Sequence, residues 1–507
     1  MKKFTLPLFA ARALCATALA ALLVGCSGQK EQRIVIVSTN DMHAAIERFP
    51  QLATLVDSLR ATGDPVILAD AGDWSTGNPY ADLYPHRGAP QIELMNDLGY
   101  DIATLGNHDF DNGIDTLAKR LSQAHFRVVV ANMHTNGAMP QPAPYCFIDA
   151  GGIRLGFLGL ITVTDSGFPD GFPSSFGAAT FSDPIATARQ YAFLKDSCDV
   201  LIALTHIGFA KDSMLAAAMP RIQIIIGGHS HTVLPEGRWM GGGLPAGGTL
   251  ITQTGSKLRY AGVTTLTVND DGQVTGIDNR LVELDKLAPR PEVAKIVAQF
   301  KNNPAFTQVA GRAADHFNKN AIMSLYADAM REGTGADVAL ANRGGVRIDY
   351  LNPGPVTRGD VFMLEPFGNK AVVATMTAEQ IKAMIINKFN SEGKESHSIE
   401  LWPSGMSYEV VKGADGQARD VQLHIAAGRG SAGGGQRDNA PRGGSGGAGA
   451  GGGLYRVAMS DYVATAYHFP RSGEIRPTGT PITTFIINYI QRHTPIVPDP
   501  SLRGVVK

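Results

Sequence analysis

Five short segments of the chain carry acidic, amide or imidazole side chains directly after apolar runs. The residues are Asp41 and His43, then Asp73, then Asn107 with His108 and Asp111, then His206, and last His229 with His231. A lone Asp or Asn after a strand is often only a helix cap or a turn residue. Capping does not explain why His recurs in four of the five segments. The pattern therefore predicts that the five segments form one site.

The residue types in these segments suit divalent metal ions. Carboxylate, imidazole and amide oxygen together are ligands for Zn, Mn, Fe or Co. The set is too large for one tetrahedral ion, but it suits two ions that share a bridging carboxylate. Two ions about 3.5–4 Å apart can hold the attacking and leaving oxygens of a displacement at phosphorus. The chemistry predicted from the residues is therefore metal-assisted hydrolysis of a phosphoester.

Short apolar runs along the first part of the chain predict the strands of a domain, and several of them end directly before these segments. They are IVIV (34–37), PVILA (65–69), FRVVVA (126–131), IRLGFLGL (153–160), DVLIAL (199–204) and IQIIIGG (222–228). Such runs are typical of strands buried on both faces, and helical patterns lie between them. We expect an α/β domain over 33–285, with GVTTLTV (262–268) at an edge. In α/β folds, ligand sites lie at the carboxyl ends of the strands.

The rest of the chain predicts a linker and a second domain. PEVAKIVAQFKNN (291–303) is amphipathic and indicates a linker helix within 286–303. Residues 304–507 alternate helical and strand patterns, as in an α+β domain. Half of the residues in 428–453 are Gly, so we expect a flexible loop there.

The N-terminal segment predicts export and lipidation. Residues 1–26, MKKFTLPLFAARALCATALAALLVGC, have the form of a secretory signal that ends at a lipobox-like Cys26. A membrane-spanning anchor is the alternative, but Pro7 and Arg12 interrupt the run. We expect a lipid-anchored protein of the bacterial cell envelope, facing the periplasm or the outer surface. The formal net charge of −1 offers no basic field for nucleic acid.

Two Cys residues would remain in the mature chain, Cys146 and Cys198. The compartment permits a disulfide between them. We favour the interpretation that they are two small buried apolar side chains.

Several motifs resemble those of a known family. TNDMH, AGDWSTGNP, LGNHDFDNG, ALTHIG and GGHSH occur in the order and spacing of the calcineurin-like metallophosphoesterases. QTGSKLRYAG, NRGGVR and EPFGN add a closer resemblance to the bacterial and animal 5′-nucleotidases. The resemblance covers nearly all of the mature chain. It implies a four-layer β-sandwich flanked by helices, a linker helix, and a C-terminal α+β domain that binds substrate.

The resemblance also implies a role for each residue of the first domain. One metal ion would be held by Asp41, His43, Asp73 and His231, and the other by Asp73, Asn107, His206 and His229. A hydroxide that bridges the two ions would attack phosphorus. His108 would face the phosphate, and Asp111 would orient its ring as the second member of a catalytic dyad.

In the second domain, the resemblance implies that Asn342 and Arg347 contact substrate, and that Phe367 and Tyr462 stack on a nucleobase. Judged by residue type alone, Phe367 could instead be a core aromatic and Arg347 part of a surface ion pair. The family's Gly-Gly-Asp motif is replaced here by Ala466, Tyr467 and His468.

A second departure from the family lies in HFNKN, where His316 and Lys319 replace an Arg and a Glu. The metal centre is complete, whereas the nucleoside pocket is altered.

We therefore expect hydrolysis of nucleoside 5′-monophosphates, with a membrane partner through the lipid and no nucleic acid partner. The alternatives are a 2′,3′-cyclic nucleotide phosphodiesterase, a nucleotide-sugar hydrolase or another phosphoesterase. From a different class, the alternative is a non-catalytic surface lipoprotein that binds a ligand. Lost metal ligands would be the signature of that last alternative, and none is lost.

Overall fold

The computed structural model describes residues 31–244, 247–269, 273–391, 398–425 and 453–507. The predicted signal segment 1–26, with Cys26, lies outside the described residues, as does all of the Gly-rich segment 428–453 except Gly453. Within the described ranges, no helix is both long enough and apolar enough to cross a membrane.

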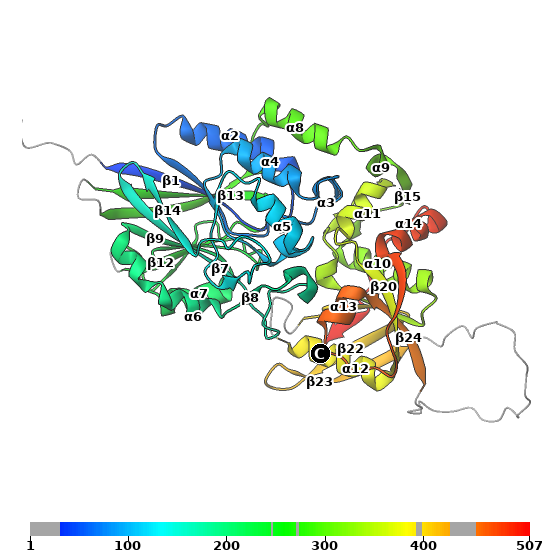
Figure 1. The fold of residues 1–507 in the computed structure, drawn as a ribbon. Helices are drawn as coiled ribbons and strands as arrows, with labels where there is room; N and C mark the ends of the chain where they lie inside the picture. Colours follow the sequence, from blue (N-terminus) through cyan, green and yellow to red (C-terminus); the bar gives the residue numbers. More distant parts are fainter. Residues whose placement is uncertain (1–30, 245–246, 270–272, 392–397, 426–452) are drawn as a thin grey trace, which may run out of the picture.

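The first domain contains two six-stranded sheets packed face to face (Figure 1). The first sheet has the order β14-β13-β1-β2-β3-β4 and the second the order β11-β12-β10-β9-β7-β6. The strands of the first sheet are β1 (Gln32–Thr39), β2 (Val66–Asp70), β3 (Ile102–Ala103), β4 (Arg127–Val128), β13 (Tyr260–Val268) and β14 (Val274–Glu283). Those of the second are β6 (Tyr145–Ala150), β7 (Ile153–Ile161), β9 (Val200–His206), β10 (Ile224–Gly227), β11 (Arg238–Met240) and β12 (Thr249–Thr252).

Helices cover the outer face of each sheet. Side chains alternate along a strand, so in β1 Ile34 and Ile36 join the core between the sheets, while Val35 and Val37 pack toward the helices. The outer helices are α2 (Phe49–Arg60), α4 (Ala89–Leu98) and α5 (Ile114–Leu121) on one side and α6 (Pro184–Gln190) and α7 (Phe209–Ala218) on the other (Figure 1). The expected four-layer fold class is confirmed.

Two strand predictions were wrong in detail. The segment 262–268 was expected at an edge, but β13 lies inside its sheet, between β14 and β1. The run 126–131 contributes only the two residues of β4, because the chain leaves the first sheet there. The amide of Ala131 already donates to the carbonyl oxygen of Gly159 in the second sheet, at 2.8 Å.

The linker contains helix α8 (Pro291–Lys301), which begins with Pro at its first position, where the missing N–H costs no hydrogen bond. The amphipathic helix predicted at this place is confirmed. It packs against α2 of the first domain. The domain limits 33–285, 286–303 and 304–507 stay a prediction.

The second domain is built around a five-stranded sheet of order β21-β17-β24-β20-β25. Its strands are β17 (Val338–Asn342), β20 (Lys370–Thr377), β21 (Leu401–Ser404), β24 (Leu454–Ser460) and β25 (Arg476–Pro481). One core packs α10 (Lys319–Thr334), α11 (Arg358–Leu364) and α14 (Ile482–His493). The other packs α12 (Ala378–Asn390), α13 (Asp461–Ala466) and a sheet of β23 (Ala418–Ile425), β22 (Met406–Lys412) and β26 (Gly504–Val506). This is the expected α+β domain.

Short elements complete the described chain. They are α3 (Pro79–Asp82), α9 (Pro304–Thr307) and the strand pairs β5 (Met133–His134) with β8 (Thr180–Phe181), β15 (Val309–Ala313) with β19 (Gly354–Thr357), and β16 (Phe317–Asn318) with β18 (Tyr350–Leu351). Single 3-10 turns are η1 (Ile46–Arg48), η2 (Asn107–Phe110), η3 (Pro173–Phe176), η4 (Ala192–Ser197), η5 (Leu284–Lys286) and η6 (Arg343–Gly345).

Cys146 and Cys198 are free thiols in the structure. Each packs against an apolar core of the first domain, as expected, but both are only half-buried.

The passage of the chain from the first sheet onto β7 of the second requires glycine at position 159. A Cβ atom there would lie 1.9 Å from the carbonyl oxygen of Val129, which is backbone and cannot move aside. We expect Gly159→Ala to lower the free energy of unfolding by about 1–3 kcal/mol. The melting temperature of the purified protein measures this. Gly243→Ala is the control, because a Cβ atom there meets nothing within 4 Å. Equal melting temperatures for the two variants would contradict this packing.

Candidate metal centre and catalytic site

The predicted metal ligands lie in tight turns at the carboxyl ends of strands of both sheets. Asp41 follows β1, Asp73 follows β2, and His206 is the last residue of β9. The first two turns are joined by backbone hydrogen bonds, from Asp41 N to Gly72 O and from His43 N to Asp73 O, both 2.9 Å long. Parallel pairing of β1 with β2 and of β9 with β10 therefore brings distant segments to one place.

Most of these turns hold their ligand residue in a left-handed backbone conformation. The residues with φ between 48° and 74° include Asp41, His43, Asp73, His229 and His231. For residues with a Cβ atom this conformation costs about 1–2 kcal/mol each. Strained backbone of this kind gathers at functional sites, where it aims side chains that a regular strand would point elsewhere.

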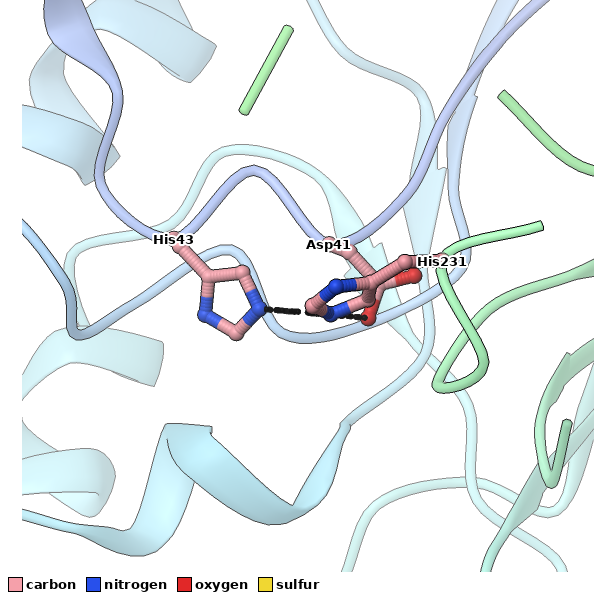
Figure 2. A group of neighbouring side chains, drawn as sticks. All are labelled: Asp41, His43 and His231. Carbon is pink, nitrogen blue, oxygen red and sulfur yellow. Dashed lines mark hydrogen bonds and ion pairs between the residues drawn. The ribbon is translucent and has the colours of Figure 1, made fainter. Parts of the chain in front are cut away.

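One cluster consists of Asp41, His43 and His231 (Figure 2). His231 Nε2 lies 3.2 Å from Asp41 Oδ1 and 3.1 Å from His43 Nε2. The other nitrogen of His43, Nδ1, lies 3.1 Å from the carbonyl oxygen of Thr76, and a carbonyl only accepts. This places the ring proton on Nδ1 and leaves a lone pair on Nε2, directed at His231. Two imidazole nitrogens and a carboxylate that converge in this way fit a cation.

A second cluster consists of Asp41, Asp73 and His206. His206 Nε2 lies 3.1 Å from Asp73 Oδ2 and 3.9 Å from Asp41 Oδ1, and its Nδ1 donates to the carbonyl of Ala71 at 2.8 Å. Burial lowers the pKa of His206, but Asp73 and Asp41 outweigh it and raise this pKa to about 10 in the absence of metal. The carboxylates thus attract positive charge to this point, whether a proton or a metal ion.

The remaining predicted ligands are Asn107 and His229. Asn107 Oδ1 lies 3.0 Å from His229 Nδ1, and the amide of His229 lies 3.0 Å from Asp41 Oδ2. Glycine allows this crowding, since a Cβ atom at position 106 would lie 2.2 Å from Asp73 Oδ1. The structure therefore brings the predicted ligands together: the two clusters share the carboxylate of Asp41, and Asn107 and His229 lie beside them.

The predicted dyad is formed at the edge of the metal centre. His108 Nδ1 lies 2.7 Å from Asp111 Oδ2, which orients the ring. Burial lowers the pKa of His108, but the carboxylates of Asp111 and Asp73 outweigh it and raise this pKa above its ordinary value. The backbone amide of His108 donates to Asp73 Oδ1 at 2.8 Å. The two carboxylates thus hold the imidazole in place and favour its protonated form.

Residues predicted to contact substrate reach this site from the second domain. The Phe367 ring stacks on His108 with centroids 5.5 Å apart, and Arg347 Nη2 lies 2.8 Å from His43 Nε2. The Cζ atom of Arg347 also lies 5.5 Å from the Phe367 ring centre. These contacts exclude the interpretation of Phe367 as a core aromatic and of Arg347 as part of a surface ion pair.

The other two residues predicted to contact substrate, Asn342 and Tyr462, also belong to the second domain. Asn342 is buried at the end of β17, and its Oδ1 atom has no hydrogen-bond partner. Tyr462 donates a hydrogen bond to Asp170 Oδ1 at 2.8 Å, so it contacts the first domain as well.

Sequence reasoning missed several residues of the site. Asp109, for which the sequence predicted no role in the site, accepts hydrogen bonds from the amides of Asp73, Ser75 and Gly106 at 3.0, 2.9 and 2.8 Å. It thereby ties two ligand-bearing turns together. Its position inside LGNHDFDNG was the available signal.

Lys257, within the QTGSKLRYAG motif, is a second residue of the site for which the sequence predicted no role. Its amide donates to Asp41 O at 2.8 Å, and its ammonium group donates to the carbonyl of Arg347. Burial and the nearby Arg347 lower the pKa of Lys257 to about 8.

The altered segments of the second domain form contacts of their own. Lys319 donates to the carbonyls of Val346 and Ile348 at 2.6 and 3.1 Å, and so braces the turn that carries Arg347. Tyr467, at the place of the expected glycine, donates to the buried carboxylate of Glu400 at 2.8 Å. No feature of the sequence around Glu400 indicated this contact.

Two family models match the chain. That of the calcineurin-like phosphoesterases covers residues 34–233, and that of the 5′-nucleotidase C-terminal domain covers residues 296–425. The chain is 26% identical to a 5′-nucleotidase of Vibrio cholerae over 448 residues, which are 73% of this chain and 79% of that one. It is 28% identical to the trifunctional nucleotide phosphoesterase YfkN of Bacillus subtilis over 405 residues, but spans only 27% of that longer protein. The fold matches the crystal structure of a 5′-nucleotidase precursor from Thermus thermophilus, with a TM-score of 0.78 at 23% identity, over 94% of this chain and 99% of that one.

The geometry separates residues that hold metal from residues that act on substrate. We expect Asp73→Ala to lose bound metal, because its carboxylate contacts His206 and lies close to His43. His108→Ala should keep the metal, yet hydrolyse p-nitrophenyl phosphate about 10²–10⁴-fold more slowly. Metal content by plasma mass spectrometry and phosphate release measure the two effects. Asp115→Ala, an exposed carboxylate, is the control. Loss of metal in His108→Ala would show that the roles are divided differently.

Proposed function

We propose that this chain, which belongs to the calcineurin-like phosphoesterases that carry a 5′-nucleotidase C-terminal domain, hydrolyses nucleoside 5′-monophosphates to nucleoside and phosphate. Membership makes the chain a metal-dependent phosphoester hydrolase. The observation that carries the choice of substrate is the stacking of Phe367 on His108. It places an aromatic surface directly beside the dyad, where a base joined to the reacting phosphoester would find a stacking partner. The 5′-nucleotidase of Vibrio cholerae is a relative of similar length.

The donor set supports a centre with two divalent ions. Asp41, His43, Asp73 and His231 would hold one ion, and Asp73, Asn107, His206 and His229 the other. When bound, Zn, Mn, Fe or Co ions supply an acidified water and neutralise charge on the phosphoryl oxygens. We propose this pair of ions as the cofactor.

The protein's own residues supply the rest of the chemistry. His108 is held by Asp111 through Nδ1, so its Nε2–H is available to a phosphoryl oxygen and can give its proton to the leaving 5′ oxygen. The guanidinium group of Arg347, beside His43, stabilises negative charge on the phosphate. Phe367 and Tyr462 would stack on the base, which tolerates different bases.

A second candidate substrate is a different phosphoester, such as a 2′,3′-cyclic nucleotide or a nucleotide sugar. It is favoured by Tyr467, which stands at the place of the family's Gly-Gly-Asp motif and donates a hydrogen bond to Glu400. Phosphate release from AMP, 2′,3′-cyclic AMP, UDP-glucose and bis-p-nitrophenyl phosphate with defined metals distinguishes the candidates.

If a base stacks on Phe367, loss of this ring should weaken hydrolysis of AMP more than hydrolysis of p-nitrophenyl phosphate. We expect Phe367→Ala to lower kcat/KM for AMP, relative to kcat/KM for p-nitrophenyl phosphate, about ten- to a hundredfold, since stacking of a base contributes about 1–3 kcal/mol. The ratio cancels any general damage to the metal centre. Phe193→Ala, at an exposed ring, is the control. An unchanged ratio would argue against a nucleotide substrate.

We also propose that the mature chain is anchored in the bacterial cell envelope by lipid on Cys26, facing the periplasm or the outer surface. The lipobox-like LVGC at 23–26 supports this proposal. We expect Cys26→Ala to move the protein from the membrane fraction to the soluble fraction of the envelope, as measured by immunoblotting. An unchanged distribution would contradict lipidation at this residue.

A further inference from the structure

A loop of the first domain connects the metal centre with the second domain. Asp170 lies in the loop between β7 and the short turn η3 (Pro173–Phe176). Its backbone carbonyl accepts a hydrogen bond from Asn107 Nδ2 at 3.0 Å. Because Nδ2 is engaged in this way, the amide oxygen of Asn107 points to the other side, where it lies 3.0 Å from His229 Nδ1. The main chain of Asp170 thus orients a predicted metal ligand.

The side chain of the same residue holds an aromatic ring of the second domain. Tyr462 donates its hydroxyl proton to Asp170 Oδ1 at 2.8 Å. Two residues further on, Phe172 packs edge to face against Tyr462, with ring centroids 5.5 Å apart. One short segment of the first domain therefore fixes the Tyr462 ring in two ways. Asp170 accepts a charge-assisted hydrogen bond, and Phe172 makes an aromatic contact.

Other contacts between the domains depend on the metal site itself. Arg347 contacts His43, and Phe367 stacks on His108. The Tyr462–Asp170 bond uses neither a predicted metal-ligand side chain nor the dyad. Loss of the bond in Tyr462→Phe therefore leaves the charges at the metal centre as they are, whereas Asp170→Ala also removes a carboxylate whose negative charge acts on His229.

We propose that Asp170 is a positioning residue that sets the separation between the phosphate end and the nucleoside end of the site. Its carbonyl orients Asn107 at one end, and its carboxylate holds the Tyr462 ring at the other. A substrate that must reach both ends gains from this fixed separation, because the ring is ordered before binding. A small phosphoester without a base gains nothing from it. The proposal rests on the proposed nucleotidase function and adds a determinant of its substrate selectivity.

Two substitutions remove the Tyr462–Asp170 hydrogen bond, one at the acceptor and one at the donor. Asp170→Ala keeps the backbone carbonyl that binds Asn107, and Tyr462→Phe keeps the ring and removes only the hydroxyl. Tyr489→Phe is the matched control, because this Tyr packs against His493 within α14 of the second domain.

In full-length protein with a defined metal, we expect Asp170→Ala and Tyr462→Phe each to raise KM for AMP. The ratio of kcat/KM for AMP to that for p-nitrophenyl phosphate should fall about tenfold in both, as for one hydrogen bond to a charged group. The double variant should fall no further, because the two changes remove one interaction. An equal loss with both substrates, or additive losses in the double variant, would overturn the proposal.

Hydrogen exchange of the substrate-free protein tests the contact separately. Peptides that cover 164–172 should exchange faster in Asp170→Ala and Tyr462→Phe than in wild type, and should be unchanged in Tyr489→Phe. Unchanged exchange in the first two variants would overturn the positioning role. A wild-type enzyme that shows no preference for AMP over p-nitrophenyl phosphate would refute the proposed function instead, and the exchange data would still decide whether Asp170 holds Tyr462.

Discussion

The structure depends on the meeting of two buried carboxylates, Asp41 and Asp73, where the carboxyl ends of two sheets converge. Both side chains are removed from water, and the desolvation of two nearby negative charges is costly unless positive charge accompanies them. The surrounding imidazoles are oriented so that a cation can bind between them and the carboxylates. Hydrogen bonds to backbone carbonyls place a proton of His43 and of His206 on Nδ1. Their Nε2 atoms then converge on the carboxylates.

The backbone around these carboxylates is shaped by the same requirement. Left-handed turns after β1, β2 and β10 aim Asp and His side chains inward. Asp109 and the glycines at 72 and 106 allow the turns to lie against one another. The free energy lost in this strain is offset by the large cores on both faces of each sheet. The rigid sandwich thus supports a strained, highly charged site at one edge.

The second domain completes the site with groups that the first domain lacks. Arg347 and Phe367 reach the metal centre from turns that follow η6 and α11. Tyr462, in the first turn of α13, reaches the neighbouring loop that carries Asp170. Residues that differ from the family motif, such as Lys319 and Tyr467, bond within that domain. The candidate metal centre and the proposed nucleoside end of the site are therefore built by different domains, and Asp170 with Tyr462 is one of the contacts that join them.

The amino-acid sequence by itself determined the fold class, the linker helix and the candidate metal ligands. These follow from local patterns: continuous apolar runs for buried strands, and metal-binding residue types placed directly after them. The limits of β4 and the internal place of β13 were decided by pairing between segments far apart in the chain. Only the tertiary structure decided that Asp170 meets Tyr462, that Lys257 meets Arg347 and that Glu400 meets Tyr467. Each of these pairs is separated by at least 67 residues. Such contacts depend on how whole elements and domains pack, and no local periodicity records that packing.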